Sequence, residues 1–236
     1  MLEALSGIYC GPPPEPADVW GRWNLDPLLL AAMAGLTLAV GRSRAGLAAV
    51  AVLAVVFVSP LCALSSAFFA ARSVHHILLV AVAAPLLAAA IPARGMGAAA
   101  PWLAISTAVL WFWHLPPAYD AALSNMAGYW IMPATLILSA CLFWRAVLSG
   151  RTQLVGRFLM VTAAYLQMAL LGAVLTFVPL PLYEIHQAAP AGWALQPLAD
   201  QQLGGLIMWV PGALPYALAA AFIARQAWPV ARGTRA

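Results

Sequence analysis

The sequence contains no lysine, and only 8% of its residues are charged, whereas 64% are hydrophobic. A water-soluble domain carries about a quarter charged residues. Too few polar side chains are therefore available to cover a surface facing water, and lipid must be the main solvent of the folded chain. We expect the lipid bilayer, and no nucleic acid, to be the surroundings of this protein.

Several motifs are also missing. The three cysteines are an odd and scattered set, which is not a disulfide framework. No nucleophile is paired with a base, and no phosphate-binding glycine loop or His-Glu-x-x-His zinc motif occurs, so we do not expect an enzyme. No repeat of about 20–50 residues is present. The sequence predicts a single transmembrane domain over residues 1–236.

Long apolar runs dominate what remains. A transmembrane helix needs about 20 mainly apolar residues, and seven runs approach or exceed this length between charges and proline-rich turns. They lie near 24–40, 46–70, 74–91, 99–118, 128–147, 157–180 and 202–224. The first opens on Asp26-Pro27, a helix-start signature. The prediction is an all-α integral membrane protein, a seven-transmembrane helical bundle kinked at prolines inside the runs, namely Pro60, Pro85, Pro133, Pro211 and Pro215.

The arginines predict how the bundle is oriented. Residues 1–22 carry three acidic residues against one arginine, so we expect an outer segment and no cleaved signal peptide. Nine arginines fall in alternate loops and the C-terminal tail: Arg42, Arg44, Arg94, Arg145, Arg151, Arg157, Arg225, Arg232 and Arg235. Only Arg22 and Arg72 lie in the other loops. The positive-inside rule then predicts an outer N-terminus and a cytoplasmic C-terminus, with all seven acidic residues outside.

Ionisable groups at membrane depth are costly and indicate candidate sites. His75 and His76 lie at the outer start of the third run, and His114 lies at the outer end of the fourth. At about 1.5 Å per residue, His76 lies about 6 Å along its helix from Arg72, and His114 lies at a similar depth. The sequence therefore predicts that two histidines share a depth on consecutive helices near the outer mouth of the bundle.

Other potential metal ligands belong to the same outer region. Asp200, Gly204 and Met208 share one helix face at four-residue spacing, and the glycine permits close approach of another helix. Cys10 lies in the outer segment, where it can fold over the mouth. Imidazole, thiolate and thioether together suit copper, above all Cu(I). We therefore predict a copper site formed from His76, His114, Asp200, Cys10, His75 and Met208.

Each of these residues also has a purely structural interpretation. His75 and His186 can bond a backbone carbonyl or a lipid headgroup, and Asp200 can cap a helix. Met208 can serve only in packing. Cys10 remains open between three roles, which are a copper ligand, an interfacial bystander and half of a bridge with Cys62.

Several segments, taken in order, resemble the membrane-embedded CtaG-type cytochrome c oxidase assembly factors of bacteria. The motifs are Trp23-Asn24-Leu25-Asp26-Pro27, Ser59-Pro60-Leu61, Val74-His75-His76-Ile77-Leu78-Leu79, Ala84-Pro85-Leu86-Leu87, Leu110-Trp111-Phe112-Trp113-His114-Leu115-Pro116, Asp120-Ala121-Ala122-Leu123 and residues 198–211. Each motif is weak alone, and their order over about residues 23–215 makes the resemblance specific.

The resemblance implies a multi-pass protein of the bacterial inner membrane that helps to build a heme-copper terminal oxidase. It further implies copper handling on the outer side, with an oxidase subunit or another copper chaperone as partner. The family's third-span pattern resembles His-Met-x-His, whereas this chain has Arg72-Ser73-Val74-His75-His76. That departure leaves His76, His114 and Asp200 as the residues that the resemblance implies, with His75 as a substitute ligand.

Two other functions fit the sequence. A copper transporter needs ligands that continue towards the cytoplasm, and only Met168, Cys141 and Met160 lie in that direction, on different helices. A heme-binding redox protein needs axial histidines, which His76 and His114 can supply at their shared depth. A visible absorption band distinguishes the heme protein, and transport across a membrane distinguishes the transporter.

Overall fold

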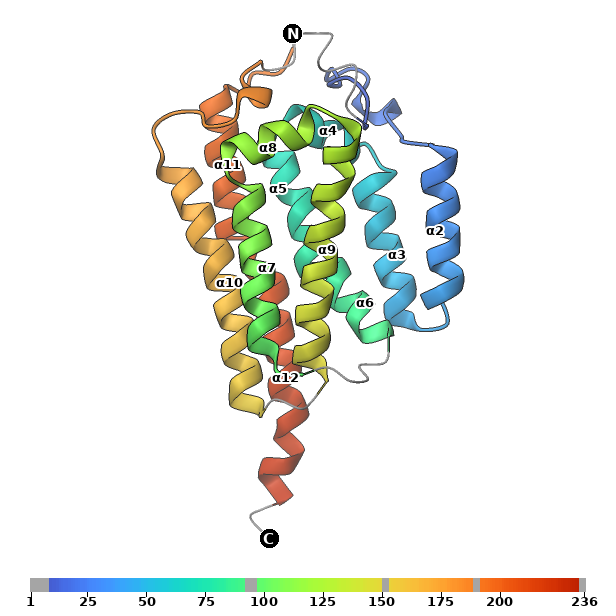
Figure 1. Cartoon of the computed structure of the whole chain (residues 1–236), viewed down its shortest axis with the longest axis vertical. Helices are drawn as coiled ribbons and strands as arrows, with labels where there is room; N and C mark the ends of the chain where they lie inside the picture. The colour runs from blue at the N-terminus through green and yellow to red at the C-terminus, as the bar shows by residue number, and fades with distance from the viewer. Residues whose placement is uncertain (1–8, 92–96, 150–152, 189–191, 234–236) are drawn as a thin grey trace.

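The computed structural model describes residues 9–91, 97–149, 153–188 and 192–233, with side chains to residue 225 (Figure 1). Its helices are η1 (Val19–Gly21), α2 (Pro27–Val40), α3 (Arg44–Phe57), α4 (Leu61–Ala67), α5 (Phe69–Ile77), the π-helical η2 (Leu78–Ala83), α6 (Ala84–Ala90), α7 (Ala99–Trp113), α8 (Pro116–Leu123), α9 (Met126–Leu148), α10 (Leu154–Phe177), η3 (Glu184–His186), α11 (Pro197–Trp209) and α12 (Ala213–Gly233). The all-α prediction is confirmed for these residues.

The long helices run side by side along the long axis of the molecule, and α8 lies across the upper end (Figure 1). At this upper end the chain also packs its N-terminal segment and the connection from α10 to α11. The described part of α12 extends below the bundle. Within the bundle, α11 packs between α5 and α10, and α7 packs along α9.

Every predicted apolar run contains a helix, but the helices differ in how well they could cross a bilayer. Among the described residues, four continuous helical segments are long and apolar enough, namely Phe69–Ala90, Met126–Leu148, Leu154–Phe177 and Pro197–Arg225. The pair α3 and α4 is a fifth if its 47° bend lies within one span. The helices α2 and α7 are apolar but shorter, with 14 and 15 residues. The seven-span count therefore stays a prediction.

Some predicted boundaries were wrong for identifiable reasons. The run predicted over 46–70 breaks twice, first at Ser59-Pro60, where the chain bends, and then at Phe68, which is extended at φ −125° and ψ 135°. The next helix therefore starts at Phe69 rather than near 74. The run predicted over 99–118 stops at Trp113, because Pro116 begins the separate helix α8.

Two sequence features act as predicted. The carboxylate of Asp26 accepts hydrogen bonds from the amides of Leu28 and Leu29 and so caps α2, with Pro27 at its first position. Pro85 follows the π-helical turn η2, as expected where proline removes an amide donor and its ring crowds the preceding turn. That turn lies directly after His75 and His76, so the irregular part of the helix borders the candidate site.

Candidate metal centre

The site begins with the way that α5 is held. Its first two amides, those of Phe69 and Ala70, donate to the carboxylate of Asp200 in α11 at 2.6 and 3.0 Å. A carboxylate suits the positive end of a helix, and here it replaces the missing intrahelical acceptors. Asp200 is 2% exposed. It therefore caps a helix, as its structural interpretation proposed, but the capped helix belongs to a different part of the chain.

Close packing around Gly204 and Gly205 brings α11 to this position. A Cβ atom on Gly204 would collide with the ring of Phe69, and one on Gly205 would lie 2.7 Å from the amide nitrogen of Thr176 in α10. The close helix approach predicted from the glycines is thus confirmed. It places the first turn of α11 at the start of α5, which contains both adjacent histidines.

Three histidine rings meet beneath this cap. His75 and His76 come from α5, and His114 ends α7 as its C-cap residue. The ring centroids of His76 and His114 are 5.6 Å apart, and those of His75 and His76 are 5.7 Å apart. All three side chains are buried. The rings of His76 and His114, predicted at a shared depth, are in contact across two helices.

The ring nitrogens of this cluster differ in how they are satisfied. Nδ1 of His114 lies 2.7 Å from the carbonyl oxygen of Leu110. Because a carbonyl only accepts, Nδ1 carries the hydrogen and Nε2 presents a lone pair. Metal-binding histidines are commonly oriented by this type of bond. Both ring nitrogens of His75 and of His76 are buried without a hydrogen-bond partner among the described residues.

The spacing of the rings is compatible with one ion between two imidazoles. Nitrogen ligands about 2 Å from a shared ion place two ring centroids on the order of 6 Å apart, close to the 5.6 Å between His76 and His114. No group of three or more His, Cys, Asp and Glu side chains in the described part of the chain is arranged to hold a metal. With no group of three in place among the described residues, at most two of these imidazoles would share an ion, a number that suits a metal with low coordination demands.

Arg72 lies next to the histidine cluster, in a helix rather than in the predicted loop. We assigned it to an outer loop, but it lies inside α5 and is 1% exposed. Its Nε donates to the carbonyl oxygen of Ser65 at 2.9 Å, and its guanidinium carbon lies 5.3 Å from the ring centroid of Tyr129. Neither terminal guanidinium nitrogen has a hydrogen-bond partner among the described residues. A fixed positive charge thus lies one helical turn from both adjacent histidines.

The remaining predicted ligands do not join the histidines. Cys10 forms a disulfide with Cys62, so of its three open roles the structure shows the bridge, and in this state its sulfur is no thiolate. Both oxygens of Asp200 are engaged by α5 amides. Met208 is buried beside Gly172 of α10, which agrees with its packing interpretation.

His186 forms a separate polar contact in η3, within the connection from α10 to α11. Its Nδ1 donates to the carbonyl oxygen of Ala67 at 3.2 Å, and its Nε2 accepts from the hydroxyl of Tyr119 at 2.7 Å. The structural interpretation of His186 is therefore confirmed. Burial, and to a smaller extent the charge of Arg72, lowers the pKa of His186 to about 3. The ring stays neutral and fastens the α10–α11 connection to α4 and α8.

Sequence reasoning missed the tyrosines around these histidines. The hydroxyl of Tyr183 donates to the carbonyl oxygen of His114 at 3.0 Å, and its ring stacks on Phe69 with centroids 4.7 Å apart. Tyr129 lies between Arg72 and the disulfide. Aromatic residues near helix ends resemble an ordinary interfacial belt, and only their contacts in the fold distinguish these tyrosines.

Comparison with known families gives one match. The model of the family described as "Cytochrome c oxidase caa3 assembly factor (Caa3_CtaG)" matches residues 28–229. Comparisons with curated proteins and with solved structures gave no match. The matched range begins in α2 and includes every helix from there to α12, so it contains all three clustered histidines.

Proposed function

The chain belongs to the Caa3_CtaG family of cytochrome c oxidase caa3 assembly factors, and from this premise we propose that it binds Cu(I) and delivers it to a heme-copper oxidase at the periplasmic face. The membership suggests a non-catalytic role in building the oxidase. We place the protein in the bacterial cytoplasmic membrane as a multi-pass bundle, with an oxidase subunit or another copper chaperone as its partner.

The pair His76 and His114 supports the copper proposal most strongly. Buried polar atoms in folded proteins almost always have partners, yet both nitrogens of His76 are without one among the described residues. The neighbouring His114 holds its ring in the orientation that exposes Nε2 as a ligand. A buried His76 whose nitrogens lack partners in the described part of the chain, packed against the ring of His114, supports binding of a soft cation here.

The charge of Arg72 supports the monovalent ion. A cation bound at His75 or His76 is repelled by this guanidinium, which lies one helical turn away. The repulsion is twice as large for a divalent ion as for Cu(I). Two nitrogen ligands also suffice for Cu(I) more readily than for Zn(II), which generally takes four ligands. The site thus favours reduced copper over the divalent competitors.

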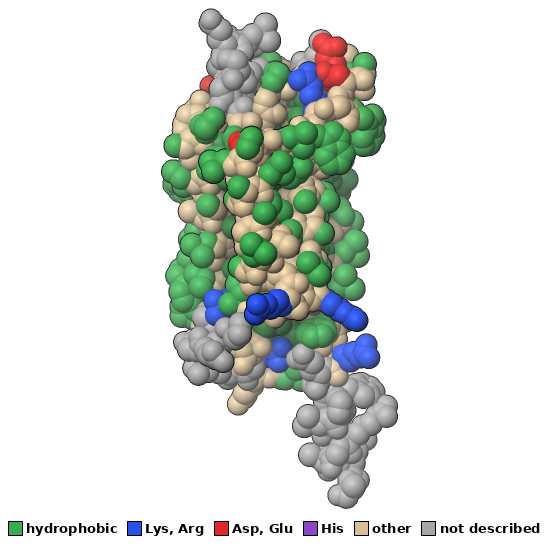
Figure 2. Space-filling model, turned by 90° about the vertical axis from the view of Figure 1, so that its right-hand side faces the viewer, with side chains coloured by type: hydrophobic (Ala, Val, Ile, Leu, Met, Phe, Trp, Pro, Cys, Tyr) green, Lys and Arg blue, Asp and Glu red, His purple; other side chains and the backbone are tan. Residues whose placement is uncertain are grey.

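The distribution of charge supports the proposed orientation. On the face drawn in Figure 2, most described arginine side chains gather at the lower end of the bundle and the acidic side chains lie at the upper end. The histidine cluster lies near the upper end, where the capped start of α5 meets α11. Under the positive-inside rule this end faces the periplasm, from which an oxidase receives its copper in this proposal.

Depletion and complementation in cells test this function. In a bacterium that makes a caa3-type oxidase and lacks its own family member, we expect this chain to restore the copper content and activity of the oxidase. His76→Ala and His114→Ala should not restore them, although both variants should accumulate in the membrane. Restoration by both histidine variants would refute the copper-site proposal, and failure of the wild-type chain would refute the assembly role.

Transport of copper is the second candidate, and the position of one thioether favours it. Below the histidines, a Cβ atom on Gly212 would lie 2.8 Å from the terminal methyl of Met168 and 3.0 Å from the carbonyl carbon of Met208. Of the two methionines, Met168 presents its side chain to this point, since the Met208 atoms there belong to the backbone. Copper uptake into sealed vesicles that contain the purified protein would support transport, whereas binding without uptake supports delivery on one side.

A further inference from the structure

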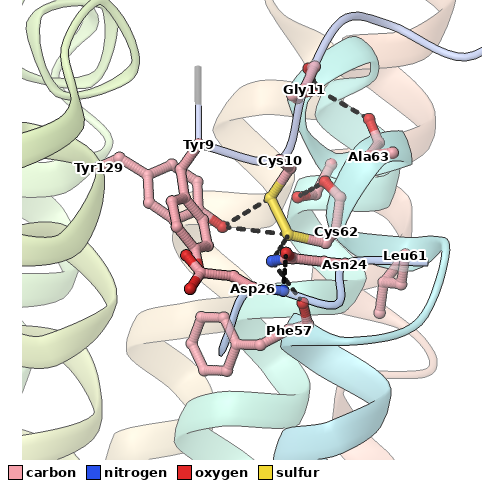
Figure 3. The surroundings of a disulfide bond; sticks show 12 residues. Tyr9, Cys10, Gly11, Asn24, Asp26, Phe57, Leu61, Cys62, Ala63 and Tyr129 are labelled. Carbon is pink, nitrogen blue, oxygen red and sulfur yellow. Dashed lines mark hydrogen bonds between the residues drawn. A yellow bond between two sulfur atoms is a disulfide. The ribbon is translucent and has the colours of Figure 1, made fainter. Parts of the chain in front are cut away.

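The disulfide between Cys10 and Cys62 joins the N-terminal segment to the first turn of α4 (Figure 3). The two Cα atoms are 5.4 Å apart. Cys62 is 1% exposed, whereas Cys10 is half-buried. Cys10 therefore keeps part of its surface exposed at this end of the bundle, whereas Cys62 is enclosed.

Hydrogen-bond donors face both sulfurs. The hydroxyl of Tyr129 lies 2.9 Å from Sγ of Cys10 and 3.6 Å from Sγ of Cys62, and it must be the donor because a disulfide carries no hydrogen. The side-chain amide of Asn24 lies 3.8 Å from Sγ of Cys62 (Figure 3). A neutral disulfide sulfur is a weak acceptor, whereas a thiolate is negatively charged and forms stronger hydrogen bonds. The surroundings are better matched to the reduced pair than to the bridge.

A positive charge reinforces this preference. The guanidinium of Arg72 lies over the ring of the same Tyr129 whose hydroxyl contacts the sulfurs. Nearby arginines stabilise thiolates over thiols. The described residues give Arg72 no carboxylate partner in an ion pair. An anion formed at the sulfurs would therefore share Tyr129 as a neighbour with a cation that has no carboxylate partner among the described residues.

We propose that the Cys10–Cys62 pair, once reduced, is a second Cu(I) site, formed by two thiolates at the outer end. A dithiol reductant supplies two electrons, the S–S bond breaks to give two thiols, and the reductant becomes a disulfide. Cu(I) then displaces two protons and joins both sulfurs in a complex with one negative charge. Reoxidation by a disulfide-class oxidant removes two electrons from the sulfurs, reforms the bridge and releases Cu(I). Soft thiolates select this ion.

The proposed thiolate pair lies close to the histidines. Phe57 accepts a hydrogen bond on its carbonyl oxygen from Asn24, and its ring contacts His75 with centroids 5.3 Å apart. One residue layer, made by Phe57 and Tyr129, thus separates the sulfurs from α5. This inference rests on the proposed function, and it assigns the outer cysteines to capture or release and the buried histidines to holding the ion.

Anaerobic titration with Cu(I), in competition with a copper chelator, tests this proposal on the full-length protein in detergent. We compare protein with the bridge intact and protein reduced by a dithiol that is then removed. Thiol counting confirms each state, because only Cys141 is free in the oxidised form. The reduced protein should bind one more Cu(I) ion per chain. This comparison requires no substitution and therefore does not depend on whether a variant folds.

Variants identify the ligands. Cys10→Ser and Cys62→Ser should abolish the additional ion, whereas the matched control Cys141→Ser should retain it. Tyr129→Phe removes one donor and should weaken the additional site by about tenfold or more. Equal copper binding by reduced and oxidised wild type would overturn the inference while the histidine site stands. No copper in either state would instead reject the proposed function as well.

Discussion

Removal of the Asp200 carboxylate distinguishes a helix cap from a copper ligand. Asp200→Ala takes away the only side chain seen to accept hydrogen bonds from the first two amides of α5. Two bonds to a charged acceptor contribute about 1.5–3 kcal/mol each. Relief of the cost of burying the carboxylate offsets part of this loss. We expect a net loss of about 2–4 kcal/mol in the free energy of unfolding.

Thermal unfolding in detergent, followed by circular dichroism, measures this effect. For a chain of this size, such a loss lowers the Tm by roughly 4–16 °C. Asp200→Asn keeps one acceptor and should lose about half as much. Glu184→Ala is the matched control, because Glu184 is an exposed acid in the connection from α10 to α11 and surface substitutions change stability by about 0.5 kcal/mol or less. An unchanged Tm together with complete loss of copper from Asp200→Ala would refute the capping account and restore Asp200 as a ligand.

Three further predictions follow from other contacts. The pKa of His186 is about 3 in the folded chain and about 6.5 in the unfolded chain, so on acidification the unfolded chain binds a proton first. The free energy of unfolding should therefore fall as the pH drops from about 6.5 towards 3. Unfolding curves of His186→Gln should lack this part of the pH dependence. Gly205→Ala should lower stability by about 1–3 kcal/mol, because its Cβ would press on α10, whereas Gly35→Ala meets open space and should not lower stability in the same assay. Arg72→Met removes a repulsion of about 2 kcal/mol per unit charge on a cation bound at the histidines. Competitive titration should therefore show tighter Cu(I) binding and a larger gain in affinity for Zn(II). Unchanged affinities would contradict the electrostatic argument.

The sequence was informative where local chemistry determines structure. Asp26-Pro27 predicted the start of α2, and the glycines after Asp200 predicted a close helix contact, since both features act within one or two turns. The shared depth of His76 and His114 on consecutive apolar runs followed from counting residues, whereas the contact between their rings is seen only in the fold. Hydropathy alone did not reveal the break at Phe68, because both sides of it are apolar and its cap, Asp200, lies far away in the chain.

The candidate site could be predicted only in part for the same reason. The bridge between Cys10 and Cys62 was one of three open alternatives, and spacing along the sequence could not decide among them. Arg72 was assigned to a loop because arginines usually mark span ends, yet it is buried beside Tyr129. Contacts between distant segments decided both outcomes, and composition carries no information about such contacts.

Anaerobic titration of Cu(I) into the disulfide-intact protein tests the central claim most directly. We predict one Cu(I) ion per chain, bound at least about tenfold more weakly in His76→Ala and in His114→Ala, with His186→Gln as the histidine control that leaves binding unchanged. Circular dichroism establishes that each variant is folded. No copper uptake by the wild type, or equal affinity in the wild type and both histidine variants, would contradict the account.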